Sequence, residues 1–174
     1  SYTTDMSGMF NGVESLTDLD LSGFDTSNVT TMEAMFGLCN ALTNINLSSF
    51  NTSKVTTMAG MFYDCHSLVS LDLSNFDTSS VTDMDSMFSC CRSLTSLDVS
   101  SFNTSKVTDF SAMFNLCDQL TSLDVTNFDT SSATSMGNNT DSYEGMFSNC
   151  SSLTSLDLSN FDTSNVTNML YMFE

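Results

Sequence analysis

The chain has 174 residues, of which three are Lys or Arg and 21 are Asp or Glu, so its formal net charge is -18 at pH 7. A chain this acidic lacks the cations that replace counterions on a phosphate backbone, which excludes nucleic-acid binding and argues against docking on anionic membranes. Its hydrophobic content of 40% predicts a folded core, and no apolar run approaches the roughly 20 residues of a membrane span.

An internal repeat accounts for the whole chain. The dipeptide Met-Phe begins at Met9, Met35, Met61, Met87, Met113, Met146 and Met172. Five of these intervals are 26 residues and one is 33, so one repeat carries a seven-residue insertion, which alignment of the flanks places at 137–143. A fixed period of this length indicates a solenoid. We therefore expect one domain over residues 1–174, with six complete strands, partial repeats at both ends and the insertion.

Each repeat contains two patterns in chain order. The segment Leu71–Leu73 alternates apolar and polar residues, which is typical of a strand with one buried face. Val81, Met84, Phe88 and Cys91 then follow at three- and four-residue steps, which predicts a short helical segment. The expected fold class is an α/β repeat solenoid of the leucine-rich type, with one short parallel strand and one short helical segment per 26 residues.

A small residue precedes most of the Met-Phe pairs, and we interpret it as room for close packing between neighbouring coils. These small residues are Gly8, Ala34, Gly60, Ser86, Ala112 and Gly145.

The full signature is Met-Phe-x-x-Cys-x-x-Leu-x-x-Leu-Asp-Leu-Ser-x-Phe-Asp-Thr-Ser-x-Val-Thr-x-Met, over residues 6–173. It resembles the BspA-like leucine-rich repeat surface proteins, a family with members among bacterial and mycoplasma surface lipoproteins. The resemblance implies an extracellular, cell-surface protein that adheres to other proteins, host matrix or neighbouring cells, and it implies no catalytic residues. Phe76 stands at a turn position where many leucine-rich repeats have Asn, which predicts an aromatic spine in place of an Asn ladder.

The cysteines and the single histidine favour structural roles. Five cysteines share one repeat position, where the first copy has Val13: Cys39, Cys65, Cys91, Cys117 and Cys150. A buried ladder of free thiols explains this best, with disulfides between coils and metal binding as alternatives. Cys90 precedes the ladder residue Cys91, and His66 follows the ladder residue Cys65, so both should face outward. Because no nucleophile–base pair and no catalytic motif is present, we expect no enzyme activity.

The candidate binding surface is a row of polar residues at the centre of each strand. The row consists of Asp20, Asn46, Asp72, Asp98, Asp124 and Asp157. We expect it on the concave face, where it either solubilises the solenoid or binds a ligand. Asp72, Asp98 and Asp124 are consecutive acids, so weak Ca²⁺ binding would centre on them; no other cofactor is expected.

A row of Thr residues also recurs, one in each repeat. Its members are Thr26, Thr52, Thr78, Thr104, Thr130 and Thr163. These hydroxyls could form an ice-binding array, but capping of turns and backbone is the simpler interpretation.

Two functions therefore remain open at this point. The first is adhesion through a face of the solenoid, and the alternative is a structural spacer in a surface stalk or filament without a ligand of its own. In either case we expect no membrane insertion in this segment. We also expect its two ends to be covered by further repeats or a partner.

Overall fold

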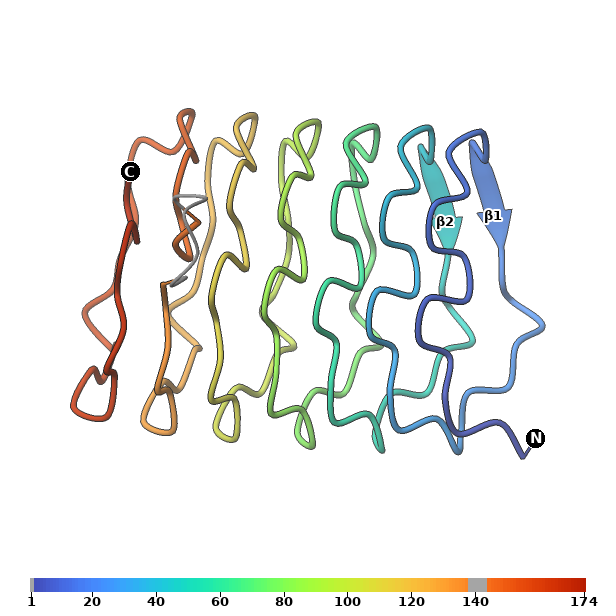
Figure 1. The fold of residues 1–174 in the computed structure, drawn as a ribbon, viewed down its shortest axis with the longest axis horizontal. Helices are drawn as coiled ribbons and strands as arrows, with labels where there is room; N and C mark the ends of the chain where they lie inside the picture. Colours follow the sequence, from blue (N-terminus) through green and yellow to red (C-terminus); the bar gives the residue numbers. More distant parts are fainter. Residues whose placement is uncertain (1, 138–143) are drawn as a thin grey trace.

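The computed structural model describes residues 2–137 and 144–174. The chain winds into a stack of similar coils, with its two termini at opposite ends of the stack (Figure 1). The insertion at 137–143 lies outside the described residues except for Gly137. No segment of the described structure is a helix able to cross a membrane.

Two short strands lie at the N-terminal end of the stack. β1 (Asp18–Asp20) and β2 (Asn44–Asn46) pair in parallel, with Leu19 opposite Ile45. In the later coils that the structure describes, the matching segments do not form strands. Of the six expected strands, two are present in residues 2–137 and 144–174.

The opposite side of the stack carries a continuous ladder between coils. One residue from each coil forms an isolated parallel bridge with its equivalents: Asp5, Thr31, Thr57, Asp83, Asp109, Ser135 and Asn168. We call the Met-Phe segment that follows each bridge residue a rung. Along a rung every second residue donates its N–H to the next coil, as Met32 does to the carbonyl of Thr57 (3.2 Å) and Phe36 to that of Met61 (2.9 Å). The residues between them close turns on their own rung, as Met35 does with Met32 (3.2 Å).

The rungs replace the expected helical segments. The described residues contain no α-helix, and the rungs are successive turns. In an α-helix every residue has right-handed dihedrals and the N–H groups bind within the helix. Here Ala34 (φ 50°) and Leu38 (φ 60°) are left-handed, and half of the rung N–H groups bind the neighbouring coil.

The position before Met-Phe has a left-handed backbone conformation in most repeats. In six repeats this position has a positive φ between 50° and 60°: Gly8, Ala34, Gly60, Ser86, Ala112 and Tyr171. Positive φ is unfavourable for residues with a Cβ, yet Tyr171 at this position and Leu38 four residues after Ala34 also adopt it, so the conformation alone does not require a small side chain. Gly145 fits the packing interpretation, because a Cβ there would overlap the backbone of Tyr171 in the neighbouring coil.

The core between the two edges is built from ladders of identical residues. The Phe of each rung stacks on its equivalents, with ring centroids 5.4 Å apart for Phe36 and Phe62 and 5.8 Å apart for Phe62 and Phe88. The rung Met and Phe side chains of the inner coils are fully buried. Stacking of this kind adds directional contacts to the burial of apolar area. On the other Phe row, Phe50 and Phe76 also stack, at 6.5 Å.

The Thr row caps backbone groups in the interior. Thr78 is buried, and its hydroxyl donates to the carbonyl of Asn103 (2.9 Å) while accepting the N–H of the same residue (2.7 Å). The same pair of bonds joins Thr52 to Asp77 in the preceding coil. A buried hydroxyl cannot meet ice, so the inner members of this row are structural.

The cysteine ladder is confirmed as free thiols. All six cysteines are unpaired, and each ladder thiol donates to the carbonyl of a Phe in the preceding coil, as Cys91 does to Phe62 (3.2 Å). Burial raises the pKa of Cys65 to about 12, so its thiol stays protonated and can keep donating. Cys90, outside the ladder, is half-buried, and burial raises its pKa as well.

Candidate functional site

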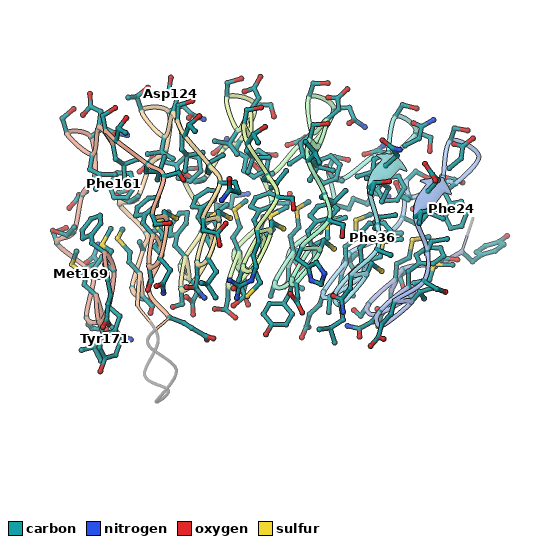
Figure 2. All side chains as sticks on the ribbon, turned by 90° about the horizontal axis from the view of Figure 1, so that it is seen from above. Phe24, Phe36, Asp124, Phe161, Met169 and Tyr171 are labelled. Atoms are coloured by element: carbon teal, nitrogen blue, oxygen red, sulfur yellow. The ribbon has the colours of Figure 1, made fainter. Side chains whose placement is uncertain are left out.

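The six residues of the expected binding row all lie exposed along one edge of the stack. We call this row the Asp edge: Asp20, Asn46, Asp72, Asp98, Asp124 and Asp157. Asp124 marks it in Figure 2, on the side away from Tyr171 and the rungs. The structure thus brings the sequence-predicted residues together as a line across the coils.

Each side chain of the Asp edge is fixed by its own turn. Oδ1 of Asp72 accepts the N–H of Ser74 (3.0 Å), and Oδ1 of Asp98 accepts that of Ser100 (2.9 Å). Oδ1 of Asn46 likewise accepts the N–H of Ser48, which explains why Asn is tolerated at this position. The side-chain and backbone hydrogen bonds from Ser74 lower the pKa of Asp72 below its ordinary value. Apart from Asn46, the row is therefore a set of ionised carboxylates with defined directions.

The Asp edge is not the concave face. In Figure 2 the coils spread apart toward the edge that carries Asp124 and lie closer together at the rungs. Backbone hydrogen bonds join each pair of neighbouring rungs in the described segments. On the strand side beyond β2, backbone bonds between the described coils are sparse, and one example runs from the N–H of Thr95 to the carbonyl of Val69 (3.4 Å). Dense backbone bonding pulls the coils together on the rung side, so the carboxylates lie on the wider, outer edge.

The described residues do not converge into a metal centre. No group of three or more Asp, Glu, His or Cys side chains is close enough to hold a metal ion in the parts of the chain that the structure describes. Asp72, Asp98 and Asp124 are spread along the stack, one per coil. Weak Ca²⁺ binding there stays a prediction, tested by whether Ca²⁺ raises the melting temperature more than NaCl at equal ionic strength.

A second acidic group, which the sequence did not single out, lies on the rung side. Asp83 and Asp109 are bridge partners in adjacent coils, and Asp85 is on the same rung as Asp83; all three are half-buried. Burial raises the pKa of Asp85 to about 6, and the nearby carboxylates of Asp109 and Asp83 add to the effect. Burial also raises the pKa of Asp83. The only signal in the sequence was that acids occupy the bridge position in two successive repeats.

We expect Asp85→Asn to stabilise the protein above pH 6 but not below pH 4. The folded state holds the Asp85 proton more tightly than the unfolded chain, whose carboxyls have pKa values near 3.9. Stability conferred by the protonated form is therefore lost as the pH rises between about 4 and 6. After discounting for solvent screening, the gain at pH 7.5 should be about 1 kcal/mol, measured by urea denaturation.

The matched control is Asp72→Asn, because the Asp edge already contains Asn46 in the same turn. This variant should change stability little at pH 7.5. A gain in Asp85→Asn that persists unchanged at pH 3.5 would show that the carboxylate is not the cause.

The base of the insertion is held by a polar clamp. The Ser111 and Ser135 hydroxyls (2.8 Å each) and the Asn168 side-chain amide (2.7 Å) all donate to the carbonyl of Gly137. Gly137 also bridges Gly145 in antiparallel fashion. The bridge from Ser135 to Asn168 beside this clamp continues the ladder into the last coil.

One protein-family model matches this repeat along the chain. Overlapping matches to one family model extend over residues 1–70, 42–144 and 93–174, and the family is described as a mycoplasma protein of unknown function, DUF285. The chain belongs to this family. Successive overlapping matches are what a repeated unit produces. No curated protein and no solved structure gives a significant match to this DUF285 protein.

Proposed function

We propose that this DUF285 protein is part of an extracellular bacterial surface protein of the BspA-like, leucine-rich type, which binds other proteins through its Asp edge. The observation that carries the proposal is the line of exposed carboxylates, each fixed in direction by its own turn, as at Asp98 and Asp124. The repeat signature supports the surface assignment through the resemblance described above.

The charge distribution indicates the chemistry of the partner. The chain has only three Lys and Arg residues, and two of them bind groups away from the Asp edge: Lys54 donates to Asn28 (2.7 Å) and Arg92 pairs with Asp118 (3.6 Å). The Asp-edge carboxylates therefore lack these cations as partners. A protein with a basic patch, on host matrix or a neighbouring cell, is the complementary surface.

The test is a charge-matched pair of triple variants. The first changes Asp72, Asp98 and Asp124 to Asn, which keeps the turn bond and removes the charge. The control changes Asp77, Asp129 and Asp162 to Asn; these carboxylates are also exposed and also cap turns, but in a different row. Binding to immobilised matrix proteins and to co-resident bacteria is measured by pull-down and surface plasmon resonance.

Loss of binding in the first variant alone supports adhesion through the Asp edge. Equal loss in both variants would reduce the effect to net charge. Binding that neither variant changes would remove the Asp edge from the site, and an absence of any ligand would favour the alternative of a spacer. The specific support for a spacer is the ladder of rung bonds, which would make the stack stiff along its length.

A further inference from the structure

The strand side of the stack is paired at one interface between coils and open at the next ones. Beside β1 and β2, the N–H of Leu21 donates to the carbonyl of Asn46 (3.2 Å). Two coils later the equivalent N–H is that of Leu73, which has no backbone partner among the described residues. The coils accordingly spread apart toward the Asp edge (Figure 2). Pairing is therefore a property of one interface and not of every Leu-x-Leu segment.

The paired interface is distinguished by the side chains that meet across it. Nδ2 of Asn44 donates to Asp18 (2.8 Å), and Nδ2 of Asn46 donates to Asp20 (3.1 Å). Each carboxylate of β1 thus meets an amide of β2, and hydrogen bonds to a charged group are the stronger kind. Because Asn46 donates to the preceding coil, the third coil, which carries Asp72, receives no such bond in the part of the chain that the structure describes.

From the third coil onward the Asp edge sets carboxylate against carboxylate. Its members there are Asp72, Asp98, Asp124 and Asp157. Hydrogen bonds from Thr126 lower the pKa of Asp124 overall, while the nearby carboxylates of Asp157 and Asp98 act to raise it. These carboxylates are therefore close enough to repel one another, and like charges opposite each other on neighbouring strands are destabilising.

We propose that the Asp edge is a charge-controlled hinge: repulsion between its carboxylates holds the third to sixth coils apart on the strand side, and replacing a carboxylate with an amide lets its coil pair with the preceding one as β2 pairs with β1. The rungs are the fixed side of this hinge, since backbone bonds join each pair of neighbouring rungs in the described segments. Pairing would bring adjacent strands to about 4.8 Å and reduce the spread of the coils. The curvature of the stack is thus set by the charge along this edge.

The register of β1 and β2 defines the bonds that closure would form. In that pair the N–H groups of Leu21 and Asn44 cross the interface, each at 3.2 Å. Between the third and fourth coils the equivalent donors are the N–H groups of Leu73 and Ser96, which make no backbone bond within the described residues. These two groups therefore report closure of this interface.

The test is Asp98→Asn with Asp129→Asn as its matched control, read by amide hydrogen exchange. The first variant places an amide opposite Asp72 in the preceding coil, and it should fold because Asn46 already occupies this repeat position. The control removes the same charge from another exposed carboxylate that also caps a turn, at Ser131. Unchanged slow exchange along the rungs serves as the check on folding.

We expect Asp98→Asn to slow exchange of the Leu73 and Ser96 N–H groups about tenfold, with no change in the control. The equivalent groups between the fourth and fifth coils, the N–H groups of Val99 and Ser122, should stay fast, because the new amide donates to the preceding coil only. Small-angle X-ray scattering should show a straighter stack.

The reverse variant is Asn46→Asp, with Asn103→Asp as its control. The first sets a carboxylate against Asp20, and it should speed exchange of the Leu21 and Asn44 N–H groups about tenfold. The control adds the same charge at an exposed turn in another row, where Oδ1 of Asn103 accepts the N–H of Ser105 (3.1 Å).

The proposal fails if Asp98→Asn is folded and leaves exchange of Leu73 and Ser96 unchanged. It fails equally if β1 and β2 stay protected in Asn46→Asp, since their pairing would then not depend on charge. Effects of the same size in the control variants would assign the change to net charge and remove the Asp edge as the hinge.

Discussion

Thr78→Val is expected to lower the free energy of unfolding by about 2–4 kcal/mol. The side chain is buried, and its hydroxyl both donates to the carbonyl and accepts the N–H of Asn103. Val preserves the shape but leaves two backbone polar groups of the next coil without this partner, and each such loss costs about 1–3 kcal/mol. Urea denaturation followed by circular dichroism measures the change.

Thr82→Val in the same coil is the matched control. The Thr82 hydroxyl donates to the carbonyl of Thr56 (3.2 Å) at the exposed surface, where the backbone N–H of Thr82 already binds that carbonyl (2.8 Å). This variant should cost less than about 0.5 kcal/mol. If the two substitutions lowered the free energy of unfolding equally, the buried Thr hydroxyls would not be stabilising the contact between coils.

Phe88→Ala is expected to be the most damaging single change, at about 3–5 kcal/mol. The ring is fully buried between those of Phe62 and Phe114, with centroids 5.8 Å away on both sides. Its loss would interrupt the stack and leave a cavity that the two neighbouring coils, tied by backbone bonds, cannot close. The measurement is again equilibrium unfolding, with the melting temperature as a second readout.

Phe173→Ala at the same repeat position gives the comparison. Because its ring is exposed and stacks on one side only, against Phe147, the truncation should cost much less. A similar cost at both positions would argue against the stack of rings as the main support of the core.

The residue rows could be predicted from the sequence, whereas the backbone between them could not. A residue type confined to one repeat position, such as the Phe of the Met-Phe pair, must be stacked on its equivalents whatever the local conformation. The three- and four-residue spacing from Val81 to Phe88 is shared by a helix and by a chain of turns. What distinguishes them is the left-handed conformation at Ser86 and the bond from Phe88 to Met113 in the next coil, neither of which has a sequence signature.

The same limit applies to the candidate site. The line of carboxylates follows from the repeat, since Asp72 and Asp98 are equivalent positions. Its place on the outer edge depends on which side of the coils is joined by the backbone ladder. The resemblance to leucine-rich repeat proteins predicts that ladder on the strand side, which would have made the Asp edge concave. The half-buried Asp85 was missed because its burial depends on the rung geometry, which replaced the expected helix.

Amide hydrogen exchange tests most directly whether the rungs hold the stack together. The N–H groups of Phe36, Phe62 and Phe88, which donate between buried coils, should exchange most slowly. Those of Ser74 and Ser100, bound only to the exposed carboxylates of the Asp edge, should exchange many times faster. Slow exchange at the Asp edge with fast exchange along the rungs would show that the rung hydrogen bonds do not hold the stack together.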